Sequence, residues 1–292
     1  MNPQPLPNPT EKSIAFQGEP GAYSHLACVE HFPDYKPLPC PTFEDAFAAV
    51  ASRTADLAMI PVENSLAGRV ADIHHLLPSS GLYIVGERFL PVRHQLLVKP
   101  GAKAGDLKSA HSHAMALGQC RNIVRELGLK AVIEADTAGS ARRLAESGDA
   151  SEAAIASSLA AEIYGLEILR ANVEDAGHNT TRFLVMAPEP DDAEPDDGLA
   201  ITTFGFRVRN IPAALYKAMG GFATNGVNMT KLESYQLEGT FRATQFYADI
   251  EGHPSDEPVR LALEELKFFS SAMTVLGVYK ADPFRTERRI ET

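Results

Sequence analysis

The stretch "APEPDDAEPDDG", Ala187–Gly198, divides the chain into two parts with different hydrophobic patterns. It holds three prolines, six acidic residues and one glycine, and its apolar residues follow no period. This composition is typical of a linker, because it can neither bury an apolar face nor extend a helix or strand. We therefore predict two domains, residues 12–188 and residues 199–282.

Before this linker, short apolar runs alternate with helical patterns. "SIAFQG" (Ser13–Gly18) and "DLAMIPV" (Asp56–Val62) have the length and composition of buried strands. Apolar positions at i, i+3, i+4 and i+7 predict one helix that begins near Ser112 and ends at Gly128. The alternation predicts an α/β domain with mostly parallel strands, in which ligands bind at the carboxyl ends of the strands.

After the linker, the pattern from Leu199 is strand, helix, strand, strand, helix, strand. This order predicts a ferredoxin-like βαββαβ domain.

Composition limits the classes of partner. The chain has 292 residues and a net charge of −11, which argues against nucleic acid because phosphate binding leaves a basic footprint. The three cysteines form no CxxC pair, and the histidine pairs at 74–75 and 111–113 lack matching ligands, so we predict neither a disulfide framework nor a metal site. The polar start and the lack of a long apolar run predict a cytoplasmic protein without a membrane span.

Polar clusters follow several of the predicted strands. Ser112 and Gln119 are seven residues apart, about two helical turns, so they would share one face of the predicted helix. In "HNTTRFLVM" (His178–Met186), Thr181 and Arg182 precede an apolar strand, and a guanidinium suits a carboxylate. Taken alone, Ser112 and Gln119 are better interpreted as a helix cap and a surface side chain, whereas Thr181 and Arg182 are equally compatible with a functional site and with a solvated strand end.

Together, the clusters resemble the prephenate dehydratase family, in its monofunctional form. The resemblance is carried, in the family's order, by "AFQGEPGAYSHLA", "IPVENSLAGRV", "HSHAMALGQC", "ADTAGSAR", "AAIASSLAAEIYGL" and "HNTTRFLVM". The later segment "NIPAALYKAMGGFATNGVNMTKLESY" resembles the ACT regulatory domain of these enzymes. The resemblance covers nearly the whole chain.

The resemblance implies a catalytic domain of two α/β lobes, like a periplasmic binding protein, with the second lobe at roughly residues 95–172. The implied reaction is the decarboxylating dehydration of prephenate to phenylpyruvate in phenylalanine biosynthesis, which needs no cofactor. By resemblance, Thr181 is the catalytic residue. The residues expected to bind substrate are Asn64, Ser65, Ser112, Gln119 and Arg182.

The resemblance also implies feedback by L-phenylalanine, bound between ACT domains of a homodimer or homotetramer. The expected effector-binding residues are Asn210, Ala213, Ala214, Leu215, Asn228, Met229, Thr230, Glu233 and Ser234.

Two other functions are compatible with the sequence. One is arogenate dehydratase, which performs the same elimination on the amino analogue of prephenate. The other is a non-catalytic cytoplasmic sensor of amino acids or other solutes, because lobed α/β folds also serve binding proteins.

Overall fold

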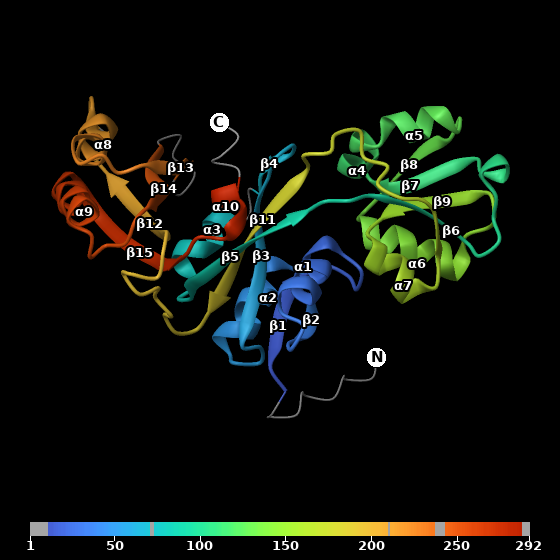
Figure 1. Cartoon of the computed structure of the whole chain (residues 1–292), viewed down its shortest axis with the longest axis horizontal. Coiled ribbons are helices and arrows are strands. Elements are labelled where there is room, and N and C mark those ends of the chain that lie inside the picture. Colours follow the sequence, from blue (N-terminus) through green and yellow to red (C-terminus); the bar gives the residue numbers. More distant parts are fainter. Residues whose placement is uncertain (1–10, 71–72, 210, 237–242, 288–292) are drawn as a thin grey trace. The chain divides into compact units, whose positions relative to one another are not determined.

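The computed structural model describes residues 11–70, 73–209, 211–236 and 243–287, and it confirms the α/β fold class (Figure 1). The chain groups into two compact units, and each is described by itself. The first consists of Met1–Ala46, Met59–Arg69 and Leu90–Phe183, and the second of Phe47–Ala58, Val70–Phe89 and Leu184–Thr292.

The first sheet has the order β2-β1-β3-β11-β5, with β4 paired to β3. Its strands are β1 (Ser13–Gln17), β2 (Lys36–Cys40), β3 (Leu57–Asn64), β4 (Gly68–Arg69), β5 (Tyr83–Pro91) and β11 (Thr180–Ala187). The helices between these strands are α1 (Tyr23–His31), α2 (Phe43–Ala51), α3 (Ile73–Leu76) and the 3-10 turn η1 (Leu77–Ser79). The apolar runs predicted as strands, Ser13–Gly18 and Asp56–Val62, form β1 and most of β3, and their central residues are fully buried.

Strand β2 was not predicted, because its sequence "KPLPC" contains two prolines. It pairs in parallel with β1 at one end of the sheet order. The flanking backbone bonds, from Lys36 N to Lys12 O and from Gly18 N to Cys40 O, show that even-numbered residues of β2 face β1. Pro37 and Pro39 therefore face outward, where a missing N–H breaks no ladder bond.

The second sheet has the order β10-β6-β9-β7-β8. Its strands are β6 (Gln95–Val98), β7 (Ser109–His113), β8 (Lys130–Glu134), β9 (Glu152–Ala156) and β10 (Glu167–Arg170). Its helical elements are η2 (Ala104–Asp106), α4 (Ala114–Gln119), α5 (Arg121–Glu126), α6 (Thr137–Ser147) and α7 (Ser158–Tyr164). β7 is parallel to both β8 and β9, whereas β6 is antiparallel to β9 and β10. Residues 92–94 and 171–179 connect this lobe to the first sheet, as the two-lobed prediction requires.

The single helix predicted from Ser112 to Gly128 is wrong. Ser112 lies on β7, and the helical pattern is broken into α4 and α5 at Cys120, whose φ of −125° and ψ of 35° are not helical. The break is stabilised by Asp175, whose N–H donates to Gln119 O at 2.6 Å and whose carboxylate accepts the N–H groups of Arg121 and Asn122, both at 3.0 Å. Periodicity could not reveal this partner, which lies 55 residues further along the chain.

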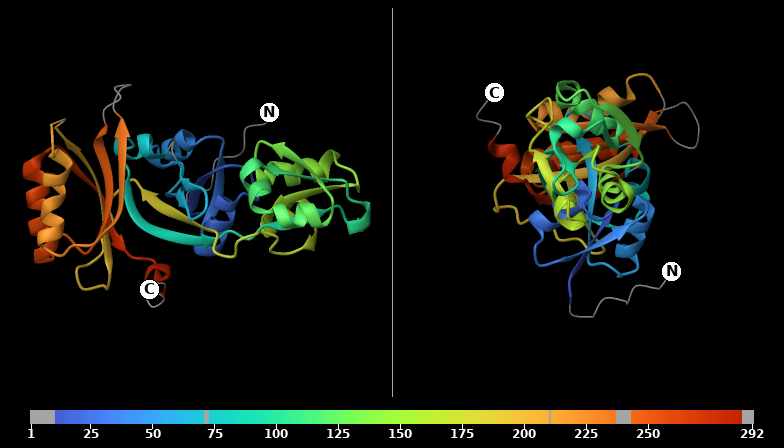
Figure 2. Two further views of the ribbon diagram at one scale, coloured as in Figure 1. Left: turned by 90° about the horizontal axis from the view of Figure 1, so that it is seen from above. Right: turned by 90° about the vertical axis from the view of Figure 1, so that its right-hand side faces the viewer.

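The predicted βαββαβ order after the linker is confirmed. Its elements are β12 (Ala200–Val208), α8 (Ala214–Thr224), β13 (Met229–Gln236), β14 (Ala243–Glu251), α9 (Glu257–Phe269) and β15 (Ser270–Lys280), and a short α10 (Pro283–Glu287) follows. The sheet order β13-β14-β12-β15 is antiparallel throughout. Both helices pack side by side on one face of the sheet (Figure 2), over a core that includes Phe204, Phe206 and Phe222.

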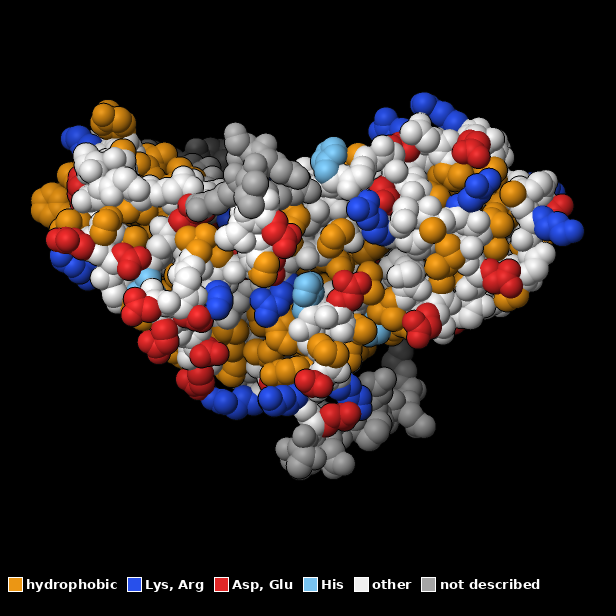
Figure 3. Space-filling model, viewed as in Figure 1, with side chains coloured by type: hydrophobic (Ala, Val, Ile, Leu, Met, Phe, Trp, Pro, Cys, Tyr) orange, Lys and Arg blue, Asp and Glu red, His pale blue; other side chains and the backbone are white. Residues whose placement is uncertain are grey.

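The linker residues 188–199 form no helix or strand, and acidic side chains gather over them at the lower left of Figure 3. The domain boundary placed there stays a prediction. In the described part of the chain, no helix is long and apolar enough to cross a membrane.

Candidate active site

A chain of side-chain hydrogen bonds brings three of the predicted site residues together. Asn64 Nδ2, at the end of β3, donates to Thr181 Oγ1 on β11 at 2.9 Å and to Asn179 Oδ1 at 2.8 Å. Asn179 Nδ2 in turn donates to Gln119 Oε1, at the end of α4, at 2.9 Å. Thr181, Asn64 and Gln119 therefore belong to one network, which joins elements of both lobes.

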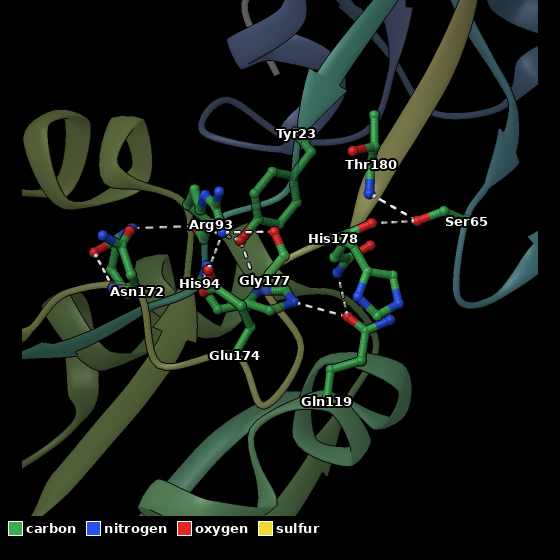
Figure 4. A network of polar contacts seen from close by, with 12 residues as sticks. Tyr23, Ser65, Arg93, His94, Gln119, Asn172, Glu174, Gly177, His178 and Thr180 are labelled. Atoms are coloured by element: carbon green, nitrogen blue, oxygen red, sulfur yellow. Dashed lines mark hydrogen bonds and ion pairs between the residues drawn. The ribbon is translucent and has the colours of Figure 1, made fainter. Parts of the chain in front are cut away.

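The network continues to two residues that the sequence did not indicate. His94 Nε2 lies 2.9 Å from Gln119 Oε1, and the Tyr23 hydroxyl lies 2.7 Å from His94 Nδ1 (Figure 4). His94 is the last residue before β6, and Tyr23 is the first residue of α1. His94 lies outside the quoted motifs, and Tyr23 lies within "AFQGEPGAYSHLA" but was not singled out, so only the folded chain identifies both as members of the network.

The donors and acceptors of this chain have one consistent direction. Asn64 Oδ1 accepts the N–H groups of Leu66 at 3.0 Å and Ala67 at 2.9 Å, which fixes the orientation of the Asn64 amide. Its NH₂ group must then face Asn179 Oδ1, and the Asn179 NH₂ group must face Gln119 Oε1. Because an amide oxygen only accepts, His94 Nε2 is the donor to Gln119. In a neutral His94 ring, Nδ1 is then an acceptor for the Tyr23 hydroxyl at 2.7 Å, and Arg93 O is a second acceptor at 3.2 Å.

Burial favours the same neutral state of His94. The side chain is 2% exposed, and burial lowers the pKa of His94 more than the hydrogen bond to Gln119 and the nearby Glu174 raise it. Burial, together with Cys120 and Glu174, also holds the pKa of Tyr23 well above its usual range, so its hydroxyl keeps its proton. The hydrogen-bonded side chains that link Tyr23 to Thr181 thus carry no formal charge near neutral pH.

Two hydrogen-bond donors of this network are available to a ligand. Thr181 Oγ1 accepts from Asn64, which leaves its O–H able to donate. Gln119 Nε2 has no hydrogen-bond partner within the described part of the chain, because its oxygen takes both contacts of that side chain. Both residues are partly exposed. The network therefore leaves one hydroxyl donor and one amide donor unused.

Glu174 joins the two segments that connect the lobes. Its carboxylate, 3% exposed, accepts His94 N–H at 2.9 Å and Arg93 Nη1 at 2.8 Å. Arg93 Nη1 also donates to Gly177 O at 3.2 Å. These contacts hold His94 in place and neutralise the Glu174 charge with Arg93.

Ser65 has a positioning contact in the structure. Its hydroxyl donates to His178 O at 2.8 Å and accepts Thr180 N–H at 3.0 Å (Figure 4). The Ser65 N–H donates to Thr180 O at 2.9 Å. Ser65 thus fixes the start of β11, the strand that presents Thr181. Its predicted contact with substrate stays a prediction.

Ser112 and Arg182 are not part of this network. Ser112 is fully buried, and its hydroxyl donates to Ile155 O at 2.6 Å within the second sheet. It lies on a strand, so the helical face that it was predicted to share with Gln119 does not exist. Arg182 is buried, and it follows Thr181 in an extended strand, so the two side chains point to opposite faces of the sheet.

The turn "QGEPGAYS" packs against the second lobe. Ser157 Oγ donates to Gly21 O at 2.5 Å, and Tyr164 OH donates to Pro20 O at 2.8 Å. Gly21, at φ +90°, leaves no room for a Cβ atom beside Ala160. A cavity near this turn is lined by residues such as Gln17, Glu19, Cys40 and Asp136, and it includes none of the network side chains.

The predicted effector residues lie in the βαββαβ module, except that Asn210 lies outside the described residues. Ala213 has a left-handed φ of 61° just before α8, where Ala214 and Leu215 begin the helix. Asn228 Nδ2 donates to Glu251 Oε2 at 2.8 Å, and Glu233 pairs with Lys231 at 3.5 Å. Met229, Thr230 and Ser234 lie on β13 with Glu233. Their role in effector binding stays a prediction.

Among the described residues, no group of three or more His, Cys, Asp or Glu side chains could hold a metal ion. The three cysteines are buried thiols, and burial raises the pKa of each.

Comparison with known proteins identifies the family. The family model for prephenate dehydratase matches residues 14–191. A curated protein of Komagataeibacter europaeus, named bifunctional N-acyl-homoserine lactone acylase/prephenate dehydratase, is 56% identical over 94% of this chain and 98% of its own length. An Arabidopsis thaliana protein named arogenate dehydratase/prephenate dehydratase 1 is 38% identical over 93% of this chain and 73% of its own. The solved prephenate dehydratase of Arthrobacter aurescens, in complex with L-Phe, has a TM-score of 0.83 and 31% identity over 91% of this chain and 89% of its own.

Proposed function

Because this chain belongs to the prephenate dehydratase family and is therefore a dehydratase of the lyase class, we propose that it converts prephenate to phenylpyruvate. The observation that carries the proposal is the hydrogen-bond chain that leaves the Thr181 hydroxyl and the Gln119 amide as unused donors. This geometry suits an anionic substrate with a hydroxyl leaving group.

The chemistry requires a donor at the departing oxygen. Prephenate carries a ring hydroxyl opposite a ring carboxylate, and loss of both makes the ring aromatic. The carboxylate leaves as CO2 and the hydroxyl takes up a proton to leave as water, so the difficult step is the expulsion of hydroxide. A donor at that oxygen accelerates such a step by ~10²–10⁴-fold.

Thr181 is the proposed donor. Asn64 donates to Thr181 Oγ1 at 2.9 Å, and hydrogen bonds in a chain polarise one another, which strengthens the O–H as a donor. Negative charge that develops on Oγ1 as its proton shifts is stabilised by the same Asn64 N–H. The proton that Thr181 gives to the leaving oxygen is replaced from solvent.

Prephenate is favoured over arogenate by the neutrality of the donors. Arogenate carries an ammonium where prephenate has a ketone, and an ammonium is best matched by a carboxylate. The network offers amides and hydroxyls, and its one acid, Glu174, is paired with Arg93 and His94 N–H. We expect a higher kcat/KM on prephenate than on arogenate.

The deciding experiment is the growth of phenylpyruvate absorbance after prephenate is added to the purified protein. The same preparation is assayed with arogenate, with phenylalanine as the product. A solute sensor would bind one of these compounds without turnover, and that outcome would refute the proposal.

Feedback by L-phenylalanine is the proposed role of the βαββαβ module, in a homodimer or homotetramer. The support is the relative whose solved structure contains L-Phe and the match of the fold. A ligand shifts an equilibrium only by differential affinity, so phenylalanine must bind a less active state more tightly. Initial rates with and without phenylalanine test this, and unchanged rates and cooperativity would exclude it.

A second candidate function is acyl hydrolysis, which appears in the name of the relative from Komagataeibacter europaeus. The Thr181 network does not favour it, because Thr181 is bonded to an amide and not to a base. The observation that favours it lies in the second lobe, where Ser109 is hydrogen-bonded to His111 and His111 to Glu134. Release of free acid from an N-acyl-homoserine lactone tests this activity.

A further inference from the structure

A second histidine-centred arrangement lies in the second lobe. Ser109 and His111 are two residues apart on β7, so their side chains point to the same face of the sheet. Ser109 Oγ lies 2.9 Å from His111 Nε2, and His111 Nδ1 lies 3.1 Å from Glu134 Oε1. Glu134 is on the neighbouring strand β8, in register with His113, and so shares this face. Two paired strands therefore hold all three groups in a fixed geometry.

The direction of these two hydrogen bonds follows from the carboxylate. An ionised carboxylate only accepts, so Nδ1 of a neutral His111 donates to Glu134. Nε2 then has a lone pair and accepts the Ser109 proton. This is the polarity that a hydroxyl nucleophile needs from its general base, with the base oriented by a third group.

Arg143 of α6 supplies a cation to the carboxylates on this face of the sheet. Its Nε lies 3.1 Å from Glu134 Oε1, and its Nη1 lies 2.9 Å from Glu152 Oε2. Glu152 on β9 is in register with Ser109, so the guanidinium lies over the same part of the sheet. Arg143 Nη2 is buried and has no hydrogen-bond partner within the described residues. A buried donor without a partner is costly, and an acyl oxygen at Ser109 could satisfy it.

The three cysteines and Ser112 fit the role of a nucleophile less well. The thiols of Cys28, Cys40 and Cys120 are buried, and burial raises the pKa of each, which disfavours the reactive thiolate. Ser112 is fully buried and donates to a backbone carbonyl. Ser109, in contrast, is partly exposed.

We propose that Ser109, His111 and Glu134 form an acyl-transfer site that hydrolyses small amides or esters. This inference rests on the second candidate function and gives it a location apart from Thr181. Ser109 Oγ bonds to the acyl carbon while its proton passes to His111 Nε2. The bond from the acyl carbon to the leaving nitrogen or oxygen then breaks, and the leaving group takes that proton. Water repeats the sequence on the acyl-enzyme, releases the acid and restores Ser109.

The test uses the full-length protein with two probes, p-nitrophenyl butyrate and an N-acyl-homoserine lactone, and prephenate in parallel. Ser109→Ala should lower hydrolytic kcat/KM by ~10²-fold or more, since loss of a nucleophile removes the whole pathway. Dehydration of prephenate should stay near the wild-type rate, which also shows that the variant is folded. Ser147→Ala, an exposed serine on α6, is the matched control and should change neither activity.

Each outcome has a distinct meaning. If Ser109→Ala retains wild-type hydrolysis, this site is wrong while the second candidate function stands. If the wild-type protein hydrolyses neither probe, both the proposed site and the second candidate function are refuted. The prephenate assay tests the dehydratase activity independently. Should Ser109→Ala fail to fold, a fluorophosphonate decides with the wild-type protein. An adduct on the peptide that contains Ser109 supports the site, and labelling elsewhere or not at all overturns it.

Discussion

His94 and His111 are both buried and both hydrogen-bonded at each ring nitrogen, but their partners differ in charge. His94 lies between the Tyr23 hydroxyl and the Gln119 amide, in a chain without formal charge. His111 lies between Ser109 and Glu134, beside the guanidinium of Arg143. The same side chain therefore serves as a fixed spacer in one network and as a base in the other.

The difference shows how a neighbour sets the role of an imidazole. An amide oxygen only orients the ring, whereas a carboxylate also stabilises the imidazolium that forms when the ring takes a proton. A neutral network suits a substrate whose carboxylate must depart, because a strong cation would hold that carboxylate in the ground state. The following predictions test this distinction, from the largest expected effect to the smallest.

Removal of the Thr181 hydroxyl should have the largest effect. Thr181→Val should lower kcat on prephenate by ~10²–10⁴-fold, whereas Thr181→Ser keeps the donor and much of the rate. Thr180→Val is the matched control in the same strand, because its side chain is buried and lies outside the network. Wild-type kcat in Thr181→Val would remove Thr181 from the mechanism.

Placing a charge in the neutral chain should have the next largest effect. Gln119→Glu keeps an acceptor for Asn179 and His94 but replaces the unused amide donor by a negative oxygen. We expect kcat/KM on prephenate to fall by ~10–10²-fold, from a lost charge-assisted hydrogen bond and repulsion of the dianion. The pKa of His94, followed by NMR, should rise. Gln245→Glu, in the βαββαβ module, serves as a control, and equal kinetics in the two variants would contradict the prediction.

Removal of the cation from the charged cluster should affect stability. Arg143→Gln removes the guanidinium partner of Glu134 and Glu152, while Glu134 keeps its contact with His111, and the three side chains of the ion pairs are 24–32% exposed. We expect a loss of about 1–3 kcal/mol in the free energy of unfolding, between the values for surface and buried pairs. Arg260→Gln breaks an exposed pair with Glu264 on α9 and should cost only about 0.5 kcal/mol. Urea unfolding of both variants gives the comparison, and equal losses would show that the cluster acts as an ordinary surface pair.

The neutral state of His94 should make the free energy of unfolding depend on pH, and this is the smallest of the expected effects. Burial lowers the pKa of His94 and of His25, so the unfolded chain binds protons more readily than the folded chain. The stability that this contributes is complete above about pH 6.5 and is lost as pH falls from there through the folded-state pKa. Urea unfolding at about pH 7.5 and about pH 5.5 should show a smaller loss for His94→Gln than for the wild-type protein. A loss of the same size in both would show that His94 is not held neutral.

Much of the fold could be predicted, because its signals are local. The apolar runs that became β1 and β3 and the βαββαβ order needed only periodicity and composition. The helix predicted from Ser112 to Gly128 was wrong, because Asp175 stabilises the break between α4 and α5 from a distant part of the chain. Local patterns do not contain such partners.

The site was predicted only in part, for the same physical reason. Asn64, Gln119 and Thr181 stood in recognisable motifs and lie in one network. His94 belongs to it because a segment that connects the lobes brings it to Gln119, and Tyr23 belongs to it because the start of α1 lies against His94. Arg182 looked like a partner of Thr181 in the sequence, but adjacent residues of a strand point to opposite faces.

The prolines of β2 also bear on the solubility of the protein. A strand at the end of a sheet is a template on which another chain can pair and start an aggregate. Pro37 and Pro39 occupy the outward-facing positions of β2, where they offer no N–H to an incoming strand. The two prolines that kept β2 from being predicted as a strand therefore also prevent another strand from pairing with its outer edge. Valine at both positions would keep the pairing with β1 and make the concentrated protein more prone to form β-rich aggregates.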